Sequence, residues 1–440
     1  MSGTSLLGVL LFAGVLGAAW SWSGCNDNPT QIGEGYLPQN VKFEQLYLPF
    51  SEFSITSGIS AVSNGSNDLN DAMLVGKAED GTVAHGLLAL IDNSDLLRDI
   101  TPDQILKAEL RMRTFNYRYG DTASRQIEFD VTSIEGTFGS RAKWEDDLIA
   151  TINAGTNLGS YAGSYQDTTT ISVELTPDRI AEFLNSYYRI DTVVPDQGDT
   201  LFQTVTLRTL ALRASDNGKM IGSFLGTTTS SVADSVRPQL RITLQDTVIN
   251  LTMGVSNWVA QYPDSFESGP GIIAIGGGVP IRTLIKFRLD SIPDGAVIHR
   301  AELTLHINPA LASQGTTGQT SRVIAYVAGE DPLGDNFLAT YPSIGQIFLR
   351  GSRPAKDDES LGDEIIFSGF GTTIKQWLGA ERNIGNPESA IPNNGLILSI
   401  DKSLPNLESG TVDRLGFYGL DAPEELRPQL TIIYSIQTDV

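Results

Sequence analysis

The chain has 440 residues, a formal net charge of −22 at pH 7 and one cysteine. This length suits two all-β units of about 200 residues each. The acidity argues against a nucleic-acid-binding protein, because phosphates require a basic surface. A single cysteine excludes an intrachain disulfide and a cysteine-based zinc site.

The N-terminus carries a short apolar run from Leu6 to Ala19, followed by small residues and Cys25. The run is too short to span a bilayer, and the small residues are typical of a signal peptide. The segment resembles a bacterial lipoprotein signal. That resemblance implies that residues 1–24 are removed and that Cys25 becomes a lipidated N-terminus at the outer membrane or cell surface. The alternative is an ordinary secretory signal with an incidental cysteine.

Residues 25–40 are polar and rich in Gly and Pro, which predicts a tether without regular structure. The segment from Cys25 through Ile32 and Gly33 to Leu37 also resembles the start of a Bacteroidota lipoprotein family of unknown function.

The first unit, residues 41–246, begins with apolar and polar residues in alternation, as in a strand. Further on, Ala108, Leu110 and Met112 alternate with polar residues, which predicts a half-buried strand of an antiparallel sheet. A helix is predicted to start at Thr176, because Thr, Pro and Asp follow one another there as N-cap, first helical residue and first-turn acid. Its apolar stripe is Ile180, Phe183, Leu184 and Tyr187.

The same features recur in a second unit, residues 247–440. Ala108-Glu109-Leu110 returns as Ala301-Glu302-Leu303, and each is followed at nearly the same distance by Arg-Pro-Gln-Leu, at 237–240 and 427–430. The helix positions return as Ile374, Trp377 and Leu378. The chain is therefore predicted to be a tandem duplication of an antiparallel β-sandwich with one short helix in each copy. We expect residues 247–440 to fold independently and Trp377 to be buried.

The second unit resembles the bacterial surface domains called DNRLRE over nearly all of residues 247–436. The matching segments are Leu284 to Phe287, Ile292 to Ala296, Ala301 to Leu305, Ile374 with Gln376 and Trp377, Asn394 to Leu396, and Arg427 to Thr431. The six-letter signature is absent, and Asp413-Arg414-Leu415 is a fragment of it. The resemblance implies a two-sheet jelly-roll fold. It also implies either affinity for acidic polysaccharide or a structural role in surface proteins.

The sequence carries no recognisable catalytic motif. His85, His299 and His306 lack partners at triad or metal-ligand spacing, and a nucleophile elbow and a phosphate loop are both missing. We expect no enzyme activity and no cofactor. The pairs Asp146-Asp147 and Asp357-Asp358 could ligate calcium, although adjacent loop carboxylates are more often solvated.

The candidate ligand-binding residues are Arg111, Arg113, Tyr117 and Tyr119. A period of two places them on the outward face if Ala108 faces the core, and there the rings could stack on sugars while the arginines pair with uronate carboxylates. The alternative is a bulge or turn near Asn116 that reverses the alternation and buries the rings.

The sequence is compatible with two functions. The first is a lipid-anchored, non-catalytic protein whose partner is polysaccharide. The second is a structural protein of the cell envelope or extracellular matrix that acts as a spacer or protein-binding module. An open aromatic face on the Ala108 strand would favour the first function, and a covered one would favour the second.

Overall fold

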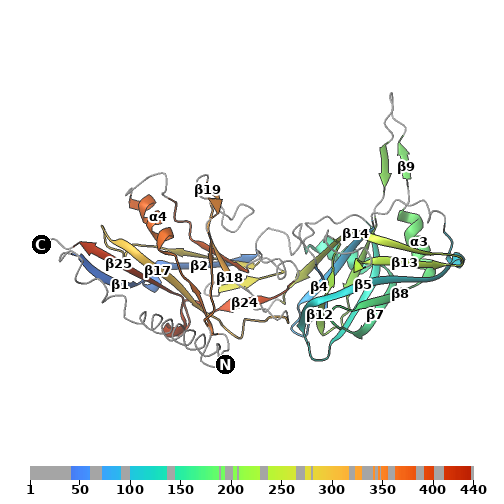
Figure 1. The fold of residues 1–440 in the computed structure, drawn as a ribbon, viewed down its shortest axis with the longest axis horizontal. Coiled ribbons are helices and arrows are strands. Elements are labelled where there is room, and N and C mark those ends of the chain that lie inside the picture. Colours follow the sequence, from blue (N-terminus) through green and yellow to red (C-terminus); the bar gives the residue numbers. More distant parts are fainter. Residues whose placement is uncertain are drawn as a thin grey trace, which may run out of the picture.

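The computed structural model describes residues 41–59, 72–90, 100–135, 144–187, 190–193, 202–205, 208–227, 236–263, 273–278, 281–316, 323–329, 340–341, 345–346, 348–354, 362–382, 391–400 and 411–437. These residues form antiparallel sheets with three short α-helices, which confirms the all-β fold class. The strands gather into two bodies along the long axis of the molecule, called here the first and second sandwich (Figure 1).

The first sandwich is one sheet that curls until its ends meet. Its strands are β3 (Ala72–Lys77), β4 (Val83–Leu90), β5 (Ile105–Gly120), β6 (Gln126–Glu135), β7 (Thr156–Ser164), β8 (Thr170–Leu175), β11 (Arg208–Ala214), β12 (Met220–Leu225), β13 (Gln239–Leu244) and β14 (Val248–Gln261). The order β14-β13-β5-β12-β3-β4 is closed by a second pairing of β14, with β4. Strands β11, β6 and β7 extend the sheet beyond β4, and β8 pairs with β5. The hairpin β9 (Ile190–Val193) and β10 (Phe202–Val205) forms a separate pair.

The second sandwich has two principal sheets. Their order is β1-β25-β17-β22 and β2-β16-β23-β18-β21, and β15 pairs with β24 beside them. The strands are β1 (Val41–Tyr47), β2 (Phe53–Ile59), β15 (Ile273–Gly276), β16 (Ile281–Phe287), β17 (Val297–His306), β18 (Val323–Val327), β21 (Phe348–Arg350), β22 (Glu364–Phe367), β23 (Leu396–Ile400), β24 (Arg414–Phe417) and β25 (Gln429–Gln437), with the short pair β19 (Thr340–Tyr341) and β20 (Gly345–Gln346) apart from them.

Two helices match the predicted ones, and a third was not predicted. Helix α3 (Pro177–Tyr187) begins at the expected position, α4 (Gly371–Arg382) includes the expected apolar positions and continues past Leu378, and the apolar triplets of both, including Trp377, are buried. Helix α2 (Asp146–Ala154) packs Leu148 and Ile152 onto the outer side of the first sandwich, in a small apolar cluster of its own. The first unit therefore contains two helices rather than one.

The repeated motifs occupy equivalent places in the two sandwiches. In the first, Ala108 of β5 lies opposite Ile242 of β13. In the second, Ala301 of β17 lies opposite Ile432 of β25. Each isoleucine stands two residues after the leucine of an Arg-Pro-Gln-Leu motif, so the two strand pairs share one register.

The first strand of each repeat lies in the sandwich of the other repeat. Strand β14 pairs with β13 and β4, and its Trp258 is fully buried in the core of the first sandwich. Strands β1 and β2 pair with β25 and β16, and Leu48 and Phe53 join the core of the second sandwich. The strand pairing thus crosses the predicted boundary between residues 246 and 247. A fragment starting at 247 would lack two strands of its sandwich and carry one that belongs elsewhere.

Phe53 provides a test of this exchange. Its ring lies 5.2 Å from that of Phe287, which lies 6.1 Å from Trp377. We expect Phe53→Ala to lower the free energy of unfolding by about 3 kcal/mol, because it removes a buried aromatic side chain. In protein labelled with 5-fluorotryptophan, the ¹⁹F resonance of Trp377 should shift while that of Trp258 stays in place. A shift of Trp258 alone would contradict the assignment, and Tyr47→Ala, at an exposed position of β1, serves as the control.

Candidate functional site

The predicted binding residues lie on β5, where the alternation reverses halfway along the strand. Arg111 and Arg113 are half-buried on the outward face, as predicted. Tyr117 and Tyr119 are only 3% and 1% exposed. The prediction that these rings face outward is therefore wrong, and the alternative of a bulge near Asn116 is right.

The pairing with β12 locates the irregularity. Gly222 of β12 lies opposite Arg118 of β5, and Phe224 of β12 lies opposite Thr114 of β5. Two steps along β12 therefore correspond to four steps along β5. The extra residues of β5, around Asn116, have no counterpart on β12, and across this irregular stretch the buried positions change from Met112 and Thr114 to Tyr117 and Tyr119.

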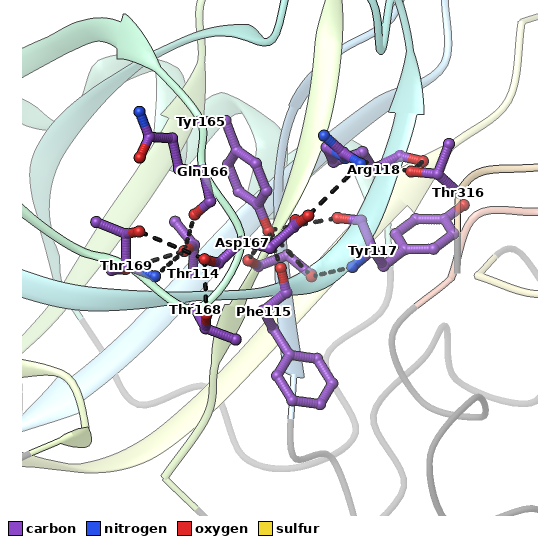
Figure 2. Close-up of polar contacts among 11 residues, drawn as sticks. Thr114, Phe115, Tyr117, Arg118, Tyr165, Gln166, Asp167, Thr168, Thr169 and Thr316 are labelled. Atoms are coloured by element: carbon purple, nitrogen blue, oxygen red, sulfur yellow. Dashed lines mark hydrogen bonds and ion pairs between the residues drawn. The ribbon is translucent and has the colours of Figure 1, made fainter. Parts of the chain in front are cut away.

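Side chains from distant parts of the first sandwich hold the bulge in place (Figure 2). The hydroxyl oxygen of Tyr165 lies 2.6 Å from the carbonyl oxygens of both Phe115 and Ser223. The amide of Tyr117 donates to the hydroxyl of Ser223 at 3.0 Å. The irregular backbone thus has fixed partners on both sides, as buried peptide groups require.

The buried end of β5 forms the junction between the two sandwiches. Tyr117 donates to Oδ1 of Asp413 at 2.8 Å and accepts from the amide of Val412 at 3.0 Å. The same Oδ1 accepts from the amide of Gly315 at 2.8 Å, and the carbonyl oxygen of Asp413 accepts from the hydroxyl of Tyr262, also at 2.8 Å. Asp413, only 2% exposed, therefore joins three segments of the chain. Burial and the charge of Asp413 raise the pKa of Tyr117 well above its usual value, so the phenol stays protonated and donates.

A second acid lies beside the first on the same junction. Asp80 accepts from Tyr119 at 2.6 Å and from the amide of Thr82 at 2.9 Å, and it pairs with Arg414 of the second sandwich at 2.9 Å. Burial alone would raise the pKa of Asp80, but these hydrogen bonds and the nearby guanidinium outweigh burial and lower it. Burial and the bond to Asp80 raise the pKa of Tyr119 to about 12.

Glycines allow the close approach of the two sandwiches. A Cβ atom on Gly315 would lie 2.4 Å from the ring of Tyr117, and one on Gly278 would lie 2.6 Å from that of Trp258. In both places a residue of the second sandwich presents bare backbone to an aromatic ring of the first. The sequence did not predict this junction, because Asp413 and Arg414 are recognisable in it only as a fragment of a family signature.

The arginines of β5 lie in two different surroundings. Arg111 and Arg113 lie opposite Ser172 and Thr170 of β8. Arg118 points elsewhere: it approaches Asp167 at 3.5 Å and donates from Nε to Thr316 of the second sandwich at 3.2 Å (Figure 2). The stacking surface that would have joined these arginines to the tyrosines does not form.

Candidate groups for metal and acid–base chemistry are dispersed. Within the described ranges, no three His, Cys, Asp or Glu residues are arranged to hold a metal ion. Asp146 and Asp147 lie exposed in the first turn of α2, where their charges suit the positive end of the helix dipole. Asp357 and Asp358 fall outside the described residues, as does Cys25. His85 is buried, and its Nδ1 accepts from the amide of Ala214 at 3.0 Å.

The junction should be sensitive to loss of one hydroxyl. Tyr117→Phe leaves the amide of Val412 without its acceptor and removes one donor to Asp413. We expect the free energy of unfolding to fall by roughly 1–3 kcal/mol, the usual cost of an unsatisfied buried group. Urea titration measures the loss. The exposed Tyr47 provides the matched control, because Tyr47→Phe should change stability by less than about 0.5 kcal/mol. Equal effects of the two changes would argue against the junction.

His85 makes stability depend on pH. Burial, with a smaller contribution from Arg213, lowers the pKa of His85 from 6.5 to about 4. Between these values the unfolded chain binds a proton that the folded chain does not, so stability falls as pH drops from about 6.5 to 4, by roughly 3 kcal/mol in total. His85→Asn, whose Oδ1 can still accept from Ala214, should remove this part of the pH dependence. Parallel curves of stability against pH for the two proteins would contradict the assignment.

Comparison with known proteins assigns no family to this arrangement. No protein-family model matches the chain. No curated protein matches it either. Among the described residues, no helix is long and apolar enough to cross a membrane.

Proposed function

We propose that the chain is a non-catalytic, lipid-anchored surface protein whose two sandwiches act as one rigid spacer. The observation that carries this proposal is the strand exchange. The chain passes between the sandwiches twice, once between β2 and β3 and once between β14 and β15, so each sandwich needs a strand from the other repeat. Two connections and a buried polar junction restrict motion far more than one linker does.

The position of the termini supports the same role. Val41, the first described residue, pairs with Gln437 near the C-terminus at the outer end of the second sandwich (Figure 1). An anchor at Cys25 would therefore attach the molecule by the second sandwich and hold the first sandwich away from the membrane. The sandwich that comes first in the sequence becomes the distal one.

Polysaccharide binding by the β5 face, the other function expected from the sequence, has less support. Its two stacking rings are in the interior, bonded to Asp413 and Asp80. Arg111 and Arg113 still face outward. With Tyr117 and Tyr119 in the interior, the aromatic side chain that remains near them on β5 is half-buried Phe115. The covered rings favour the spacer over this binding face.

Fluorescence energy transfer to a membrane dye tests the proposed orientation. Cys25 is the only natural cysteine and is blocked when acylated, so one added cysteine can be labelled selectively. We compare Lys42→Cys at the start of β1 with Leu106→Cys, an exposed position at the start of β5. Lipidated protein in vesicles should give stronger transfer from position 42, because that position lies at the attached end.

Equal transfer from the two positions would mean that the molecule lies along the membrane, which contradicts the spacer. The Cys25→Ser variant is the control for the anchor. It should remain in the aqueous phase and give no transfer from either label. Membrane association of Cys25→Ser equal to that of the parent would reject lipid anchoring.

A further inference from the structure

A polar pocket of about 600 Å³ lies on the outer side of the first sandwich. It is called here the Trp144 pocket. His85, Asp130 and Arg213 come from the sheet strands β4, β6 and β11, while Trp144 and Asn153 come from the segment around α2, and Asn217 from the loop after β11. The volume is within the range of small-molecule sites.

The aromatic part of the lining is held in place. His85 is 5% exposed and its Nδ1 accepts from Ala214, which leaves Nε2–H as the free donor of a ring that lines the cavity. Trp144 stacks on this ring, with centroids 5.3 Å apart and planes 16° from parallel. The half-buried indole gives the pocket an apolar wall of fixed orientation.

The charged part of the lining is equally constrained. Arg213 donates to Asp130 at 2.6 Å and to the carbonyl oxygen of Asn153 at 3.2 Å. Asp130 also accepts from Ser160 at 2.7 Å. A guanidinium held by two partners keeps its remaining N–H groups in fixed directions, which is the preorganisation that ligand sites require.

The pocket has no excess charge. Both cations of the lining have a carboxylate partner: Lys77 pairs with Asp216 at 3.1 Å, and Arg213 pairs with Asp130 at 2.6 Å. His85 is neutral, because burial lowers its pKa. The protein as a whole carries −22, which disfavours an anion further. The rest of the lining offers hydrogen-bond donors and acceptors, including the exposed amides of Asn153 and Asn217, beside the indole ring of Trp144. Such a lining suits a neutral ligand with many hydroxyl groups.

We propose that the Trp144 pocket binds an uncharged sugar residue. The hydroxyls would accept from His85 and Arg213 and exchange hydrogen bonds with the amides of Asn153 and Asn217, while the apolar side of the sugar rests on Trp144. This site goes beyond the spacer function, since it gives the distal sandwich a ligand of its own.

The test uses the full-length protein labelled with 5-fluorotryptophan. Trp258 and Trp377 are fully buried, so Trp144 is the one partly exposed tryptophan of the described ranges. Its ¹⁹F resonance is identified as the one missing from Trp144→Phe. Titration with glucose, galactose, mannose and their disaccharides should move this resonance saturably. Sodium acetate and phosphate should leave it unmoved.

Two variants keep the fold and remove ligand contacts. His85→Asn retains the acceptor for Ala214 but lacks Nε2–H, and Asn217→Ala truncates an exposed side chain. Each should weaken sugar binding about tenfold, the effect of one lost hydrogen bond. Asn250→Ala, at an exposed position of β14, is the matched control and should bind as the parent does. A Trp144 resonance that no sugar moves, one that acetate or phosphate moves, or sugar binding unchanged in both pocket variants would each overturn the proposal.

Discussion

The exchange of first strands is the constraint on which the rest of the structure depends. Strand β14 follows β13 through a tight turn closed by the amide of Leu244 and the carbonyl of Thr247, so it pairs at once with the strand before it. The first strand of the second repeat is thereby used in the first sandwich. Strand β25 of the second sandwich then needs another neighbour, and β1 supplies it from the opposite end of the described chain. One local hairpin thus explains a pairing between residues nearly 400 positions apart.

The polar character of the junction follows from this arrangement. Two sandwiches held by two crossings would still be free to slide if their contact were purely apolar, because apolar contacts have little directional preference. Asp413 accepts hydrogen bonds through Oδ1 and through its carbonyl oxygen, and Asp80 accepts from Tyr119 while it pairs with Arg414. Buried polar groups add little to the free energy of unfolding, but they favour one arrangement of the parts they join, because only that arrangement gives every group its hydrogen-bond partner. The junction therefore fixes the relative position of the sandwiches.

The sequence predicts well what local patterns determine. The alternation from Ala108 to Met112, the two amphipathic helices and the equivalent motifs all have the predicted structure, because each depends on residues a few positions apart. Strand exchange is different, because it depends on pairings between distant residues, such as Val41 with Gln437, that no local pattern predicts. The bulge in β5 is also invisible locally: Tyr165 and Ser223, which hold it, are 50 and 106 residues from their partners. Helix α2 had a usable signal in the spacing of Leu148 and Ile152, one turn apart.

The two repeats differ where function is expected. Residues that recur in both, such as Ala108 and Ala301, lie in the cores and maintain the fold. Residues that build the junction and the Trp144 pocket have no such counterpart among the described residues. Strand β17 ends at His306, before the positions equivalent to Tyr117 and Tyr119, and the second sandwich has one described helix, α4, where the first has α2 and α3. The first sandwich thus carries, besides a core like that of the second, both the tyrosines of the junction and a polar pocket, and Val83 and Lys77 of that pocket flank the turn that holds Asp80. Under the proposed spacer function, the Trp144 pocket would lie on the sandwich farther from the membrane, where a ligand outside the cell would reach it.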